Sequence, residues 1–309
     1  MVNLLFAAGE DRWQEYRAPL SLALAAAGVE ATLAPKMAPE RVDYIVYAPG
    51  SGLEDFRPFT RCKAVLNLWA GVENVAGNPT LTQPLARMVD EGLTRGMVEY
   101  VTGHVLRHHL GMDEHILRQD GVWRHAAPPL ARDRRVGVLG LGALGRACAG
   151  ALAALGFDVA GWSARSKDLP GIACHAGDAG LAAVLARSDI LVLLLPLTDR
   201  TDRLLNADRL ARLPRGAVVV NPGRGALIDD DALLAALDDG HLAHATLDVF
   251  RIEPLPEDHP FWQHPKVTVT PHIASETRPD SASRVIAENV RRGEAGEPFL
   301  HLVDRNAGY

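Results

Sequence analysis

The sequence has few cysteines and no excess of positive charge. Its three cysteines, Cys62, Cys148 and Cys174, are far apart and form no C-x-x-C pair. They predict neither a disulfide framework nor a cysteine metal cluster, and they favour a reducing cytoplasm. The formal net charge of −6 argues against a nucleic-acid partner, because phosphate binding needs a concentrated basic face.

The sequence also lacks long hydrophobic runs. No apolar stretch approaches the roughly 20 residues that cross a bilayer, so no membrane partner is expected. The apolar N-terminus has no basic segment before it, and it predicts a first strand over residues 2–7 instead of a signal peptide. A chain of 309 residues, 48% hydrophobic and 23% charged, suits a globular protein of two domains.

Strand-like and helix-like segments alternate along the chain, which predicts an α/β protein with parallel sheets. The first part is expected to form one small flavodoxin-like α/β domain. Its elements are predicted as strands at 2–7, 43–47 and 64–69, a helix at 12–27 and a loop at 77–80. A long helix over 97–119 follows, because apolar residues recur there at helical spacing.

The second part predicts a Rossmann-type, doubly wound parallel sheet. Its strands are nearly continuous in Val, Ile, Leu and Ala, as expected when both faces of a sheet are covered. The expected strands are 136–139, 158–162, 190–195, 217–221, 243–248 and 266–270, and the expected helices are 143–155, 177–186 and 229–237.

A last helix, at 279–293, has no strand of its own to cover, so we expect it to return to the first domain. The predicted organisation is a discontinuous substrate domain, 1–97 with 272–309, around a dinucleotide-binding domain, 98–271.

A glycine-rich turn, Gly140-Leu-Gly-Ala-Leu-Gly145, follows an apolar strand and opens a helix. The pattern alone is weak because glycine is abundant, but this context favours a dinucleotide site over an ordinary turn. Gly140 would permit the turn, Gly142 would let the backbone approach a pyrophosphate, and Gly145 would allow close helix–strand packing. The pyrophosphate would lie at the positive N-terminus of the helix.

The end of the next strand bears on which nicotinamide cofactor is bound. An NAD site places an acid there for the ribose hydroxyl, whereas this chain has Gly161-Trp-Ser-Ala-Arg-Ser-Lys167. Ser163 and Ser166 can donate hydrogen bonds, and Arg165 and Lys167 supply charge, which suits a 2′-phosphate. NADPH is therefore preferred and NADH stays open; the alternative is a solvated surface loop.

Arg224, Glu253 and His272 are the expected catalytic residues. Arg224 lies between two glycines after a buried strand, where a guanidinium can hold a carboxylate bidentately and the glycines would let a substrate approach. His272 follows another strand and could protonate the alkoxide that hydride transfer to a keto acid leaves. Glu253 would fix the tautomer of the imidazole. An arginine, a glutamate or a histidine taken alone more often has a structural role. The combination of these three residues predicts the reduction of a 2-keto acid.

Two other clusters of polar residues could be taken for metal-binding sites. His104 and His108 lie four residues apart with His109 adjacent, but no carboxylate interleaves them as H-E-x-x-H requires. A solvated helix face and no metal are expected there. The acids at 229–231 precede an apolar helical run, and they predict an N-cap with first-turn acids.

These motifs resemble the D-isomer-specific 2-hydroxyacid dehydrogenase family over nearly the whole chain, and its glyoxylate/hydroxypyruvate reductase A branch most. The segments that carry the resemblance are Trp162-Ser163, Leu213-Pro-x-Gly-Ala217, Asp231-x-Leu-Leu-Ala-Ala-Leu-Asp238, Leu247-Asp-Val-Phe-x-x-Glu-Pro-Leu-Pro256, Trp262-Gln-His-Pro265 and the tail Val303-Asp-Arg-x-x-Gly-Tyr309.

The resemblance implies roles for further residues. Arg224 would orient the substrate carboxylate, His272 would be the acid/base with Glu253 as its partner, and Asp248 would hold the nicotinamide carboxamide. The other cofactor-binding candidates are Ala143, Leu144, Leu195, Pro196 and Pro222, and the substrate loop would comprise Trp69, Ala70, Gly71 and Val72.

The resemblance further implies a homodimer that binds NADPH between its domains and reduces glyoxylate or hydroxypyruvate. After Trp-Ser the branch usually has Arg-Ser-Arg-Lys, whereas this chain has Ala164-Arg-Ser-Lys167, so NADPH preference is weaker or carried by Arg165. Candidate pocket walls are Met97, Trp69, Tyr47 and Trp262.

Three rival functions stay open. One is reduction of another keto acid, such as phenylpyruvate. The second is a formate-type dehydrogenase, which has Gln where this chain has Glu253. The third is a non-catalytic, dinucleotide-sensing module like the corepressors built on this fold.

Overall fold

The computed structural model describes residues 1–305 and 308. The chain divides into two compact units, Met1–Leu93 with Glu276–Tyr309, and Thr94–Ser275. These limits lie four residues from the expected boundaries at 97 and 271. Residues 306, 307 and 309, which belong to the tail motif and to the expected segment 272–309, lie outside the described residues.

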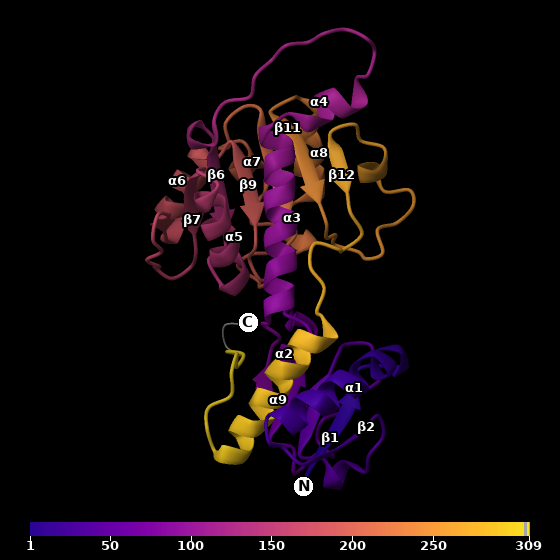
Figure 1. The fold of residues 1–309 in the computed structure, drawn as a ribbon. Helices are drawn as coiled ribbons and strands as arrows, with labels where there is room; N and C mark the ends of the chain where they lie inside the picture. Colours follow the sequence, from indigo (N-terminus) through magenta and orange to yellow (C-terminus); the bar gives the residue numbers. More distant parts are fainter. Residues whose placement is uncertain (306–307, 309) are drawn as a thin grey trace. The chain divides into compact units, whose positions relative to one another are not determined.

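The first unit contains a five-stranded parallel sheet with the order β2-β1-β3-β4-β5 (Figure 1). This is the flavodoxin-like order, as predicted. The strands are β1 (Val2–Ala7), β2 (Ala31–Ala34), β3 (Tyr44–Tyr47), β4 (Ala64–Asn67) and β5 (Leu85–Ala86), and the helices are α1 (Glu10–Ala26), α2 (Glu73–Ala76), α9 (Pro279–Ala295) and the single-turn η1 (Pro39–Arg41).

Both faces of this sheet are buried. Leu4 and Phe6 of β1 belong to the hydrophobic cluster that α1 and α9 complete, whereas Leu5 belongs to a second cluster on the opposite face. The alternation follows from the two-residue period of a strand. Because α9 packs against α1, the prediction that the last helix returns to the first domain is confirmed.

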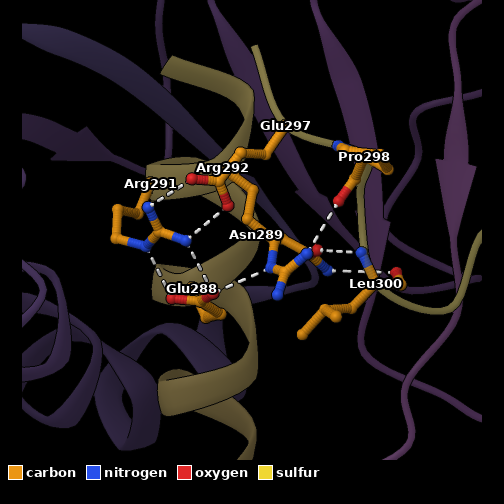
Figure 2. A network of polar contacts seen from close by, with 7 residues as sticks. All are labelled: Glu288, Asn289, Arg291, Arg292, Glu297, Pro298 and Leu300. Atoms are coloured by element: carbon orange, nitrogen blue, oxygen red, sulfur yellow. Dashed lines mark hydrogen bonds and ion pairs between the residues drawn. The ribbon is translucent and has the colours of Figure 1, made fainter. Parts of the chain in front are cut away.

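A polar network holds the chain after α9 against the end of that helix (Figure 2). The Arg291 guanidinium lies 2.8 Å from Glu288 and 2.7 Å from Glu297. The hydrogen bonds from Arg291 lower the pKa of Glu288 to about 2. The buried Asn289 side chain accepts a 2.7 Å hydrogen bond from the Leu300 backbone N–H. The direction of the tail is therefore fixed by the last two turns of α9.

The second unit contains a seven-stranded parallel sheet with the order β12-β11-β10-β9-β6-β7-β8. Six of its strands follow the Rossmann order 3-2-1-4-5-6, and β12 extends it, so the predicted fold class is confirmed. The strands are β6 (Arg135–Leu139), β7 (Asp158–Trp162), β8 (Ala173–His175), β9 (Ile190–Leu193), β10 (Ala217–Asn221), β11 (Leu242–Leu247) and β12 (Val267–Val269).

Helices cover both faces of this sheet (Figure 1). In β9, Leu191 and Leu193 join one hydrophobic cluster with α6, α7 and α8, while Ile190 and Val192 join another with α3 and α5. The helices are α3 (Glu91–His109), α4 (Met112–Leu117), α5 (Ala143–Ala154), α6 (Gly177–Arg187), α7 (Ala207–Leu210) and α8 (Asp230–Asp238), and the single turns are η2 (Ala131–Asp133), η3 (Gly225–Leu227) and η4 (Pro260–Trp262).

The single helix predicted over 97–119 is wrong at both ends. The observed α3 begins at Glu91, where the carboxylate of Asp90 accepts hydrogen bonds from the N–H groups of Gly92 (3.1 Å) and Leu93 (3.3 Å). Such capping satisfies N–H groups that have no partner within the helix. The helix ends at His109, and Gly111, with φ 61°, precedes the separate α4.

The histidines of α3 do not lie on a solvated face, so that expectation is also wrong. His108 packs against the sheet, hydrogen-bonded to Thr246 at 2.9 Å and with its ring 5.0 Å from that of His244. His109 is 6% exposed and contacts Phe157 edge-on. Among the described residues, no group of three or more His, Cys, Asp or Glu could hold a metal ion.

The acids at 229–231 have the predicted structural role. The Asp229 side chain caps α8 by accepting a 3.1 Å hydrogen bond from the Ala232 N–H, and the next two acids lie in the first helical turn. Negative charge there interacts favourably with the helix dipole. In the part of the chain that the structure describes, no helix is both long and apolar enough to cross a membrane.

The buried histidine pair should make the fold sensitive to acid. Burial, followed by the neighbouring charge, lowers the pKa of His108 to about 3 and that of His244 to about 4. Unfolded histidine has a pKa of about 6.5, so below that pH only the unfolded state binds these protons. Stability present above pH 6.5 is therefore lost as the pH falls toward 4. By pH 5 the loss should reach about 1–2 kcal/mol per histidine.

Urea unfolding at pH 7.5 and 5.0 measures this loss. The loss should shrink by about 2–4 kcal/mol in a His108→Gln/His244→Gln double variant, which lacks both histidines, and it should stay at the wild-type value for the exposed His125→Gln. An unchanged loss in the double variant would contradict the assignment.

Candidate functional site

The predicted site residues of the second unit gather at one edge of its sheet. All seven strands run parallel, so their carboxyl ends meet at a common edge, where open α/β sheets bind ligands. In chain order, this edge carries Gly140 after β6, Ser163 after β7, Leu195 and Pro196 after β9, Pro222 and Arg224 after β10, Asp248 after β11 and His272 after β12.

Two of the three glycines of the first turn lie where a side chain would clash, and the third has open space beside it. Gly140 has φ 104°, and a Cβ there would lie 2.4 Å from the Leu194 carbonyl oxygen. A Cβ on Gly145 would lie 1.7 Å from the Gly140 oxygen, so the start of α5 approaches the turn too closely for a side chain. Gly142 faces open space within 4 Å. Next to it are Ala143 and Leu144, in the first turn of α5.

The loop after β7 leaves its basic residues exposed. Arg165, Ser166 and Lys167 are exposed, whereas Ser163 is buried and its hydroxyl donates a 2.6 Å hydrogen bond to the Arg165 carbonyl oxygen. The hydroxyl of Ser163 therefore shapes the loop, while the side chains of Arg165, Ser166 and Lys167 face solvent.

His272 and Glu253 form a direct pair. The imidazole Nδ1 of His272 lies 2.7 Å from Oε2 of Glu253, and Oε1 of Glu253 accepts a 2.8 Å hydrogen bond from the Phe250 N–H. The carboxylate is thus oriented by the backbone and in turn orients the ring. With Nδ1 engaged, Nε2 is the nitrogen left to exchange a proton with a ligand.

Arg224 lies in a tightly packed turn. Asn221 donates a 2.9 Å hydrogen bond to the Arg224 carbonyl oxygen, and the guanidinium donates to the Gly223 carbonyl oxygen at 2.7 Å. A Cβ on Gly225 would lie 2.0 Å from the Phe250 carbonyl carbon, and one on Gly223 would lie 2.8 Å from the Leu193 oxygen. The expectation that these glycines make room for substrate is therefore wrong: the chain's own backbone fills that space.

Asp248 is fully buried, at 0% exposure. Its carboxylate accepts hydrogen bonds from the Thr270 hydroxyl at 2.6 Å and from the N–H groups of Ile273 at 2.9 Å and Ala274 at 2.8 Å. The observed partners are all within the chain, so the contact with a nicotinamide stays a prediction.

The predicted substrate loop belongs to the first unit. The buried Asn67 side chain donates hydrogen bonds to the carbonyl oxygens of Trp69 at 2.8 Å and Gly71 at 2.9 Å, which fixes the path of the loop through Ala70. Val72 is buried and precedes α2.

The four candidate pocket walls differ in burial. Tyr47 packs edge-on against Phe56 in a core of the first unit, and Met97 lies in a core of the second, so both are core residues. Trp69 is partly buried, with the Arg12 guanidinium 5.5 Å from its ring, and Trp262 is 49% exposed.

Sequence reasoning missed two residues beside Asp248. The hydroxyl of Tyr100, on α3, lies 2.7 Å from that of Thr270, which also bonds to Asp248. The two residues are 170 positions apart, and no local pattern signals the contact. The threonine directly before Pro271 and His272 was the one available hint.

The fold and the site define a dinucleotide-binding α/β oxidoreductase, and comparisons with known proteins give the family. Residues 102–274 match the family model described as D-isomer specific 2-hydroxyacid dehydrogenase, NAD binding domain. Glyoxylate/hydroxypyruvate reductase A of Serratia proteamaculans is 42% identical over 257 residues, which cover 81% of this chain and 82% of that protein.

Two solved structures are similar over the full length. A D-isomer specific 2-hydroxyacid dehydrogenase from Xanthobacter autotrophicus Py2, in complex with NADPH and MES, has a TM-score of 0.93 at 42% identity and covers 100% of this chain and 99% of that one. The NADPH-dependent glyoxylate/hydroxypyruvate reductase of Sinorhizobium meliloti, in complex with NADP and sulfate, has a TM-score of 0.85 at 35% identity, with coverage of 100% and 99%. The chain belongs to the D-isomer specific 2-hydroxyacid dehydrogenase family.

The glycine turn makes a testable distinction between two of its residues. Gly145→Ala places a methyl group against the Gly140 oxygen and should cost about 1–3 kcal/mol or more, a fall of roughly 3–10 °C in Tm. In Gly142→Ala the added methyl group points into open space, so only the N-cap preference for glycine over alanine is lost. This should lower the free energy of unfolding by less than about 1 kcal/mol. Calorimetry of the two variants measures this difference, and equal falls in Tm would show that the packing has been misassigned.

Proposed function

We propose that this protein catalyses the NADPH-dependent reduction of a small 2-keto acid, glyoxylate or hydroxypyruvate, to the 2-hydroxy acid. The observation that carries the proposal is the 2.7 Å pair of His272 and Glu253, at the sheet edge that also presents the glycine turn and Arg224. The similarity to glyoxylate/hydroxypyruvate reductases supports this substrate class.

The residues present fit a phosphorylated dinucleotide. The open space beside Gly142, at the N-terminus of the twelve-residue α5, suits a pyrophosphate. The exposed Arg165 and Lys167 suit a 2′-phosphate, and residues 163–167 contain no carboxylate that would repel it. Two similar structures are complexes with NADPH or NADP, which supports the same choice here. When bound, NADPH supplies the hydride.

In this proposal each polar residue has one task. Arg224 binds the carboxylate of the keto acid and orients its carbonyl group. His272 donates a proton from Nε2 to the oxygen that becomes the hydroxyl, while Glu253 at Nδ1 holds the ring in the orientation that this transfer needs. The loop 70–72 would donate backbone N–H groups to the same carboxylate, and Asp248 would contact the nicotinamide amide.

We propose a homodimer as the assembly. Of the fourteen large hydrophobic side chains found exposed among the described residues, seven lie within 110–130, and Trp123 is 92% exposed. Exposed apolar clusters of this kind mark interaction surfaces, and the resemblance to the family supports a second copy as the partner. Light scattering of the purified protein measures the assembly, and a monomer at micromolar concentration would refute it.

We also propose a reducing compartment, the cytoplasm, as the location. Cys62 and Cys148 are buried free thiols, and burial raises the pKa of each to about 12, which keeps them protonated and unreactive. Cell fractionation tests the location.

A spectrophotometric assay tests the proposed reaction. Wild-type protein should oxidise NADPH, with loss of absorbance, when glyoxylate or hydroxypyruvate is added. His272→Asn should lower kcat by about 10²–10⁴-fold, because the proton donor is lost. His125→Asn, an exposed histidine outside the site, is the matched control.

The panel should also contain phenylpyruvate and formate with NADP. If only phenylpyruvate were reduced, the substrate would be a larger keto acid than proposed. If no substrate were turned over but NADPH bound tightly, the result would favour the dinucleotide-sensing module. A kcat for His272→Asn within threefold of wild type would mean that the proton comes from another group.

Cofactor preference should depend on Arg165. Arg165→Ala removes a charge that the 2′-phosphate needs and NADH does not, so KM for NADPH should rise about tenfold and KM for NADH by less than about twofold. The exposed Arg212→Ala, outside the loop, should change neither constant. Equal effects on both cofactors would remove Arg165 from phosphate recognition.

A further inference from the structure

The backbone at His272 has an unusual conformation that needs support. Its φ is 54°, in the left-handed region that non-glycine residues rarely occupy. Such a conformation persists where several contacts with the surrounding structure hold it in place. The turn also places the imidazole beside Glu253, so whatever holds the turn also sets the direction of the proposed proton donor.

Most of the backbone hydrogen bonds that hold this turn end on one residue, and the N–H of His272 also lies 3.0 Å from the Thr270 carbonyl oxygen. The backbone N–H groups of His272, Ile273 and Ala274 all donate to Asp248: the first to its carbonyl oxygen at 2.8 Å, the second to Oδ1 at 2.9 Å and the third to Oδ2 at 2.8 Å. Three successive N–H groups therefore end on one buried aspartate. Any rotation of the Asp248 side chain would release two of the three.

Two hydroxyl groups determine the rotation of the Asp248 side chain. Thr270 donates its only hydroxyl hydrogen to Oδ1 of Asp248, at 2.6 Å. The Thr270 oxygen can then only accept from Tyr100, whose hydroxyl lies 2.7 Å away. The chain of donors thus runs from Tyr100 to Thr270 to Asp248. Burial raises the pKa of Tyr100, which keeps the phenol protonated and able to donate.

Tyr100 is itself fixed by the packing of α3. Val101, the next residue, is fully buried in the cluster between α3 and the sheet, and the ring of His104, one turn later, lies 4.4 Å from the Tyr100 ring. The donor chain therefore starts on a helix that is packed against the sheet and ends at the turn with positive φ.

We infer that Tyr100 and Thr270 are positioning residues for the acid–base His272, acting through the Asp248 carboxylate. The inference rests on the proposed function, in which His272 donates the proton. Neither residue needs to touch substrate or cofactor; their hydroxyl groups fix the carboxylate that fixes the turn.

The chain offers a closely matched control. Thr268 lies two residues before Thr270, and its hydroxyl bonds to Arg107 at 3.0 Å and to His244 at 2.9 Å, without contact to Asp248. Thr268→Val and Thr270→Val therefore remove the same group from the same segment, and only the second breaks the donor chain.

Steady-state kinetics of four variants test the inference. Thr270→Val should lower kcat about tenfold and Tyr100→Phe about threefold, because the misplaced imidazole reduces the rate of proton transfer. Thr270→Ser, which keeps the hydroxyl, and Thr268→Val should both stay within about twofold of wild-type kcat. An equal loss in Thr268→Val would show a general effect of strand packing and overturn the inference.

A second readout does not depend on turnover. In spectra of protein with ¹³C-labelled histidine, the imidazole signal of His272, assigned by its absence in His272→Asn, should shift in Thr270→Val and stay at the wild-type position in Thr270→Ser and Thr268→Val. An unmoved signal in Thr270→Val would refute the positioning role. If wild-type protein reduces no keto acid, the proposed function fails, and this measurement still decides whether Thr270 sets the His272 ring.

Discussion

The second unit depends on the parallel direction of its seven strands. Because every strand ends at the same edge, residues separated by more than one hundred positions, such as Gly140 and His272, can serve one site. The apolar faces of these strands are covered on both sides, which leaves the strand ends as the places where polar side chains can face a ligand. The arrangement explains why the proposed chemistry depends on short turns and not on helices.

Within that edge, orientation passes through hydrogen bonds of fixed direction. The Phe250 N–H orients Glu253, and Glu253 orients the His272 ring. A second path reaches the same histidine through its backbone, by way of Asp248. A side chain that must present one nitrogen to a reacting oxygen is thus held at both its ring and its main chain. This is the preorganisation that proton transfer in an active site requires.

Much of the fold and of the candidate site was predictable from the sequence, and the predictions that were wrong have physical causes. The glycine turn and the strand ends follow from local patterns of two to seven residues. The return of the last helix follows from the order of the elements, because no strand is left for that helix to cover. The short strands β2, β5 and β8 and the helices α2 and α7 were missed, because each has only two to four residues and none contains the unbroken apolar run that marks the equally short β9. The histidines of α3 were misplaced because their partners, such as Thr246, are distant in the chain. The flanking glycines of Arg224 were assigned to a ligand, whereas Phe250 occupies the space.

The convergence of three N–H groups on Asp248 also limits how this position can evolve. The site needs a short side chain with two acceptor oxygens. Among the amino acids that a single nucleotide change in an aspartate codon can produce, asparagine turns one acceptor into a donor that faces other donors. Glutamate keeps both oxygens but is one methylene too long for a fully enclosed cavity. Asparagine and glutamate, the two replacements most similar to aspartate, should therefore both hold the turn less well, and the chemistry of this position leaves it little freedom to vary.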